Sequence, residues 1–165
     1  MVQLLKQKQC SMKQKLLITS ILIFTVYLLS ILLLYGVLPS ISDSYYHLPD
    51  NLKLLFSFSL IGFAFPIVLY DNKVLNFVAG GLICFVAVSP EFKLVYEGDI
   101  HYICAVGGVL FGMLSLWINY KGWKYVVGFI LLAVVIILTL PNATWWVEVL
   151  AFYTILIRLM LNYNS

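Results

Sequence analysis

Charged residues are scarce in this sequence, and their scarcity restricts the class of protein. Only 10% of its residues are charged, against about 25% in an average soluble domain. Hydrophobic residues make up 63% of the chain, and the mean hydropathy is +1.02. A soluble domain with so little charge is excluded by these values, so we expect an integral membrane protein.

Histidine and cysteine are also rare, and they do not form the usual patterns. The three cysteines, Cys10, Cys84 and Cys104, are an odd number without C-x-x-C spacing. They imply no disulfide framework. The two histidines are far apart in the sequence, whereas a zinc site on a helix usually begins with a close pair. There is also no H-E-x-x-H, P-loop or G-x-S-x-G motif.

Long apolar runs dominate the sequence. A helix needs about 20 apolar residues to cross a ~30 Å hydrocarbon core. The runs are continuous rather than alternating, which favours helices over a transmembrane barrel. We predict an all-α bundle of six helices in one transmembrane domain, residues 1–165, with spans at 16–38, 52–70, 74–88, 100–118, 125–140 and 144–161. Because the third and fifth runs are short and the sixth contains Glu148, five spans remain an alternative. The first run exceeds the apolar core of a signal peptide and is expected to remain as an anchor.

The placement of lysine and arginine predicts the orientation. Short cytoplasmic loops are enriched in these residues. With six spans and the amino terminus inside, both termini are cytoplasmic, and two basic residues, Lys53 and Lys93, lie outside. Eight then lie inside: Lys6, Lys8, Lys13, Lys15, Lys73, Lys121, Lys124 and Arg158. The net charge of +3 reflects this topology and implies no nucleic-acid partner.

Polar residues gather on the predicted outer side. The segment 39–51 reads PSISDSYYHLPDN, and both histidines and six of the seven acids fall on that side. His101 shares a helical stripe with Gly108 and Gly112, a G-x-x-x-G pair that permits close helix packing. An imidazole in that place either bonds a neighbouring helix or takes part in ligand binding or proton transfer.

Glu148 begins the last apolar run and needs a polar partner, because a carboxylate facing lipid is costly. The alternative is an interfacial side chain that extends to the headgroups. We expect the loop to fold onto the outer mouth of the bundle, with one hydrogen-bonded cluster of Ser42, Tyr46, His47, His101 and Glu148. The wider set of candidates is Ser40, Ser42, Asp43, Tyr45, Tyr46, His47, His101 and Glu148. His47, His101 and Glu148 are the candidate metal ligands, although no cofactor is identified.

The segment SISDSYYH resembles the S-I-S-x-Y-Y-H signature of small bacterial integral membrane proteins with about six spans. NFVAGG, IHYICAVGGVLF and WWVEVLAFY are similar to later motifs of the same group, so the resemblance extends from about residue 36 to residue 157. It implies a multi-pass protein of a bacterial inner membrane, with Ser40, Ser42, Tyr45, Tyr46, His47, His101 and Glu148 at the group's polar positions. The chain departs from the group where LPDNLK replaces an earlier basic residue and in its short loop around Asp71.

Three functional classes follow. The first is a membrane component that binds lipid, a small molecule or a membrane-protein partner, including a second copy of itself, through the outer polar cluster. The second is a metal-dependent lipid or amide hydrolase, which would need about three protein ligands and an open position for water. A small transporter or oligomeric pore is the third, although broken helices and ionisable residues near the midplane would then be expected. We favour the first class.

Overall fold

A computed structural model describes residues 2–71, 73–91, 93 and 95–163, and this part of the chain is all-helical. The helices are α1 (Val2–Tyr35), α2 (Ser44–His47), α3 (Leu54–Tyr70), α4 (Val74–Val88), α5 (Val95–Tyr120), α6 (Trp123–Thr139) and α7 (Ala143–Tyr163), with a short 3-10 turn, η1 (Asp50–Leu52), before α3. The predicted all-α class is confirmed.

Four segments of the described chain are long and apolar enough to cross a membrane: Met12–Tyr35, Asp50–Tyr70, Glu97–Tyr120 and Ala143–Asn162. The apolar helices Val74–Val88 and Trp123–Thr139 are shorter. At 1.5 Å per residue, α4 is roughly 22 Å long, less than the ~30 Å of a typical hydrocarbon core. The helices therefore fit a membrane bundle, while the count of six spans remains a prediction.

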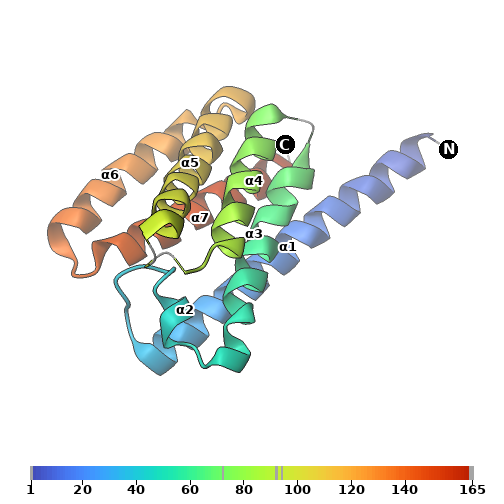
Figure 1. The fold of residues 1–165 in the computed structure, drawn as a ribbon. Coiled ribbons are helices and arrows are strands. Elements are labelled where there is room, and N and C mark those ends of the chain that lie inside the picture. The colour runs from blue at the N-terminus through green and yellow to red at the C-terminus, as the bar shows by residue number, and fades with distance from the viewer. Residues whose placement is uncertain (1, 72, 92, 94, 164–165) are drawn as a thin grey trace.

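The helices form one bundle in which α4 lies between α3 and α5 (Figure 1). α1 contacts α3 and α7, and α7 also contacts α5 and α6. An aromatic cluster joins α1, α3 and α7 at the centre: the ring of Phe24 lies 5.2 Å from that of Phe63 and 5.3 Å from that of Phe152. Figure 1 also shows the amino-terminal part of α1 extending beyond the other helices.

Cations on neighbouring helices bind the carboxyl ends of α3 and α5. The Lys13 ammonium donates to the Tyr70 carbonyl, and the Arg158 guanidinium donates to the Tyr120 carbonyl. These carbonyls lack partners within their own helices and carry the negative end of the helix dipole. Both contacts bring basic residues to the same end of the bundle, opposite the loop that follows α1.

Gly108 and Gly112 of α5 lie against neighbouring helices. A Cβ atom added at Gly108 would be 2.8 Å from Cγ1 of Ile83 on α4. One added at Gly112 would be 2.6 Å from Cδ1 of Ile155 on α7. Contacts this short leave no room for a side chain, so α5 approaches both neighbours through its glycines.

Candidate functional site

The loop between α1 and α2 is the polar segment of the site. α1 ends at Tyr35 because Gly36 takes a left-handed conformation (φ 76°) and donates to Leu32. The buried side chains of Leu38 and Ile41 then hold the loop against the bundle. A turn follows, in which the hydroxyl of Ser40 donates to the Asp43 carboxylate over 2.9 Å and accepts from the Asp43 N–H.

Glu148 is the first contact between this loop and the bundle. Its Oε2 accepts a hydrogen bond of 2.6 Å from the backbone N–H of Ile41. Glu148 lies in the second turn of α7, and the contact joins residues 107 positions apart. It supplies one polar partner for a half-buried carboxylate and one acceptor for a loop amide.

His101 is the second contact, and it joins three segments. The imidazole is 1% exposed. Its Nδ1 lies 2.8 Å from the Ser89 carbonyl, and its Nε2 lies 2.9 Å from the Ser42 hydroxyl. Because a carbonyl only accepts, Nδ1 carries the proton, and Nε2 of a neutral ring accepts from Ser42. His101 thereby connects α5 to two loops, the one after α1 and the one after α4.

Ser44 and Tyr27 connect the loop to α1. The Ser44 side chain is fully buried, and its hydroxyl donates to the Ile41 carbonyl. Its remaining partner is the phenol of Tyr27 on α1. Neither residue was among the sequence candidates. Tyr27 lies inside an apolar run, and Ser44 is one of several serines, so nothing in the sequence separated them from their neighbours.

The tyrosines of α2 form an outer rim with Lys93. The phenol oxygen of Tyr46 accepts from the Lys93 N–H, and the Lys93 ammonium lies 4.2 Å from the centre of the Tyr46 ring. That ammonium is also 3.6 Å from Asp43. The Tyr45 phenol donates to Glu91 over 3.4 Å, and its pKa is raised by burial and by the Glu91 carboxylate. Tyr45 and Tyr46 are half-buried, whereas Lys93 is exposed. Ion pairs of an exposed lysine contribute little to stability, so we assign little stabilisation to the contacts of Lys93.

His47 does not join the expected cluster. Its side chain is exposed, its Nδ1 lies 3.0 Å from the Asp43 carbonyl, and its ring is near that of Tyr35. The four-residue helix α2 places His47 one turn after Asp43, on the outer side of the loop. The prediction of one cluster containing His47, His101 and Glu148 is therefore wrong for His47. Among the residues described, no three His, Cys, Asp or Glu side chains gather as a metal site.

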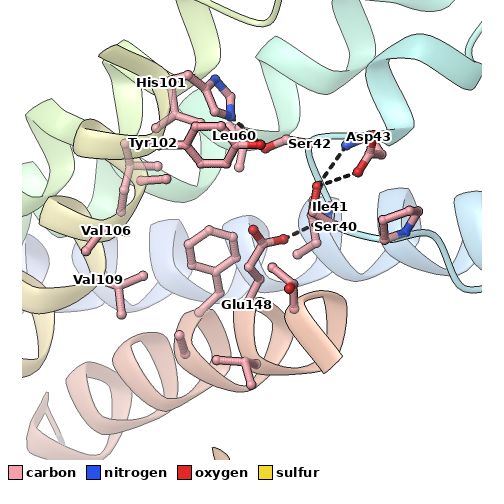
Figure 2. Close-up of a pocket in the computed structure, with 18 of the residues that line it drawn as sticks. Ser40, Ile41, Ser42, Asp43, Leu60, His101, Tyr102, Val106, Val109 and Glu148 are labelled. Atoms are coloured by element: carbon pink, nitrogen blue, oxygen red, sulfur yellow. Dashed lines mark hydrogen bonds between the residues drawn. The ribbon is translucent and has the colours of Figure 1, made fainter. Parts of the chain in front are cut away.

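A cavity of about 450 Å³ lies beneath the loop, between α5 and α7 (Figure 2). Its walls are mainly apolar and include Leu60, Ile83, Val109 and Phe152. Its polar lining is at the loop end, from Ser40, Ser42, Asp43, His101, Thr144 and Glu148. Figure 2 shows the Glu148 carboxylate projecting from α7 toward the loop. The cavity is therefore apolar at depth and polar at one end.

The cavity also reaches the side of the bundle. Tyr102, Val106 and Leu110 of α5 line it, yet each is more than half exposed, at 58%, 58% and 62%. In a membrane these side chains would face lipid. The cavity is thus open laterally rather than only at the end of the bundle.

The contact between Ser42 and His101 resembles that of an activated serine. The hydroxyl donates to an imidazole whose other nitrogen is oriented by the Ser89 carbonyl. Acyl transfer also requires N–H donors for the oxyanion. The N–H groups of the two residues that flank Ser42, Ile41 and Asp43, both donate to side-chain oxygens instead. We therefore interpret the pair as a structural hydrogen bond that fixes the loop to α5.

A second polar cluster, which we call the inner cluster, lies at the opposite end of the bundle. It consists of Asp71, Asn76, Ser115, Asn119 and Tyr120. Asn76 donates to Asp71 and Tyr120, Tyr120 donates to Asp71, and Ser115 donates to Asn76. Asn119 donates to Ser115 over 3.0 Å. These residues were not among the candidates predicted from the sequence, although an asparagine within an apolar run was a signal for such a cluster.

Comparison with known protein families, curated proteins and solved structures gives no match. The class of the molecule therefore rests on its fold and its site. The described chain is a helical bundle with four helices that can cross a membrane and a laterally open cavity capped by a polar loop.

Proposed function

We propose that this protein is a six-span membrane protein, with both termini in the cytoplasm, that binds an amphipathic molecule in the cavity beneath the loop. The binding site would face the outer leaflet of a bacterial inner membrane. The observation that carries the proposal is the cavity itself, apolar between α5 and α7 and polar at Glu148 and the loop. The resemblance to small six-span bacterial membrane proteins remains part of the proposal.

The distribution of basic residues supports the orientation. Lys13, Lys73, Lys121 and Arg158 lie at the end of the bundle that also carries the inner cluster. Short loops of that composition are retained in the cytoplasm. The shorter helices α4 and α6 fit a span if the bilayer thins locally or the flanking polar side chains extend to the headgroups.

The size and shape of the cavity support an amphipathic ligand. Small-molecule sites are commonly about 300 to 1,000 Å³ and mainly apolar, with a few placed polar groups, and the cavity of about 450 Å³ falls in this range. Its exposed edge at Tyr102, Val106 and Leu110 would admit an alkyl chain directly from the bilayer. A headgroup would then lie beside Glu148, near the membrane surface.

Photo-crosslinking with a neutral probe tests this proposal. A dodecanol bearing a diazirine and an alkyne is incorporated into phosphatidylcholine nanodiscs with the purified protein, and adducts are located by mass spectrometry. We expect the adducts to concentrate on the cavity segments of α5 and α7. Ala105→Phe should remove most of them, because Ala105 lines the cavity and a phenyl ring would fill it.

Ile103→Phe is the matched control, because Ile103 is 70% exposed and lies outside the cavity lining. It should leave the adducts unchanged. Adducts spread evenly over all lipid-facing helices, or equal labelling of the wild type and Ala105→Phe, would contradict binding in the cavity.

A further inference from the structure

We infer that the cavity selects a single-chain amphiphile whose headgroup is a protonated primary amine. This inference rests on the proposed function, since it names the ligand class of the same cavity. It depends on three features: the hydrogen bonding of Glu148, the charges around the cavity and the position of the carboxylate relative to the apolar walls.

Glu148 has one carboxylate oxygen committed to the loop and one available for a ligand. Oε2 accepts from the N–H of Ile41, whereas no donor to Oε1 is found within the described chain. Figure 2 shows the carboxylate in the space between α7 and the loop, among the other lining residues. A carboxylate is an acceptor only, so its complement is a donor group, and an ammonium supplies three N–H donors. Hydrogen bonds between charged partners are the shorter and stronger kind.

The charges around the cavity favour a cation. Glu148 and Asp43 line it, whereas no lysine or arginine is found among the described lining residues. Outside the lining, the ammonium of Lys93 lies 3.6 Å from Asp43 and is more than half exposed. His101 contributes no fixed positive charge while its Nε2 accepts from Ser42. An anionic headgroup would therefore meet a like charge.

The depth of Glu148 suits an amine at the end of one chain. Ala151 and Phe152, which also line the cavity, follow Glu148 by about one turn of α7. At 1.5 Å per residue, Phe152 lies roughly 6 Å further along the helix. Val109 and Leu110 line the facing wall on α5. A chain attached to an amine at Glu148 would thus run directly between two apolar surfaces.

Competition against the neutral crosslinking probe tests the inference. Dodecylamine, dodecanol and laurate are added to phosphatidylcholine nanodiscs, with concentrations expressed per bilayer lipid. The amine should compete at a concentration roughly tenfold or more below that of laurate, which corresponds to one hydrogen bond between charged partners. Dodecanol should be intermediate. Glu148→Gln keeps an acceptor for the Ile41 N–H but loses the charge, so it should bring the three competitors to similar potency.

Glu97→Gln serves as the matched control, because Glu97 is an exposed acid at the start of α5 outside the cavity lining. It should keep the wild-type ranking. Equal potency of the three compounds on the wild type would overturn the inference while leaving binding in the cavity intact. A ranking that persists in Glu148→Gln would overturn the role of Glu148. Failure of the neutral probe to label the wild type would instead contradict the proposed function.

Discussion

Replacing Asn76 by alanine should lower the free energy of unfolding by roughly 2 to 4 kcal/mol. Asn76 is 2% exposed, and its side chain holds three bonds of the inner cluster, to Asp71, Tyr120 and Ser115. Hydrogen bonds between membrane helices average about 0.6 kcal/mol each, so three account for nearly 2 kcal/mol. The rest comes from polar groups left buried without a partner. Unfolding in detergent, followed by circular dichroism during titration with a denaturing detergent, measures the loss.

Asn119→Ala provides the control within the same cluster. Asn119 is half-buried and donates a single hydrogen bond, to Ser115. Its loss should cost less than about 1 kcal/mol. If the two alanine variants unfold alike, or if Asn76→Ala is as stable as the wild type, then the inner cluster does not stabilise the bundle.

Leucine at Gly112 should destabilise the protein by about 3 kcal/mol, at the upper part of the range for overpacked interiors. The first added carbon would already lie 2.6 Å from Ile155, and three further carbons must be accommodated between α5 and α7. Gly108→Leu should act similarly, because its Cβ would meet Ile83 at 2.8 Å. The yield of monodisperse protein after extraction and the midpoint of thermal unfolding measure both effects.

Gly128→Leu in α6 is the corresponding control, since a Cβ at Gly128 would meet nothing within 4 Å. This variant should match or slightly exceed wild-type stability, because leucine is the better helix former. Similar losses at all three glycines would show that steric contact with α4 and α7 is not the cause.

The helices were largely predictable because each apolar run must satisfy its backbone internally in lipid. The residues at which the helices begin and end were less predictable. The first run was expected to begin at residue 16, but α1 begins at Val2, since lysine and glutamine also favour helix. The run was expected to continue to Leu38, yet the helix ends three residues earlier, at Tyr35, because Gly36 takes a left-handed conformation. Helix ends depend on local backbone conformation, which hydropathy does not report.

The site was predictable where a buried polar group required a partner. Glu148 and His101 begin apolar runs, and both contact the loop that the sequence identified, through Ile41 and Ser42. The donor to Glu148 was not predictable, because it is a backbone N–H and any residue type except proline can supply one. His47 was misplaced because the direction of its side chain depends on the short helix α2. The orientation of a loop side chain follows from turn geometry that residue type alone does not determine.

The most direct test of an outward-facing cavity in a six-span bundle is the accessibility of two single cysteines in intact cells. His47→Cys and Lys121→Cys, both at exposed positions, are introduced into a chain with Cys10, Cys84 and Cys104 replaced by alanine. A membrane-impermeant maleimide should label His47→Cys in intact cells and Lys121→Cys only after permeabilisation. Labelling of Lys121→Cys alone in intact cells would place the cavity on the cytoplasmic side. In the six-span bundle an odd number of spans separates residue 47 from residue 121, so the two cysteines lie on opposite sides of the membrane. Labelling of both in intact cells would therefore contradict this topology.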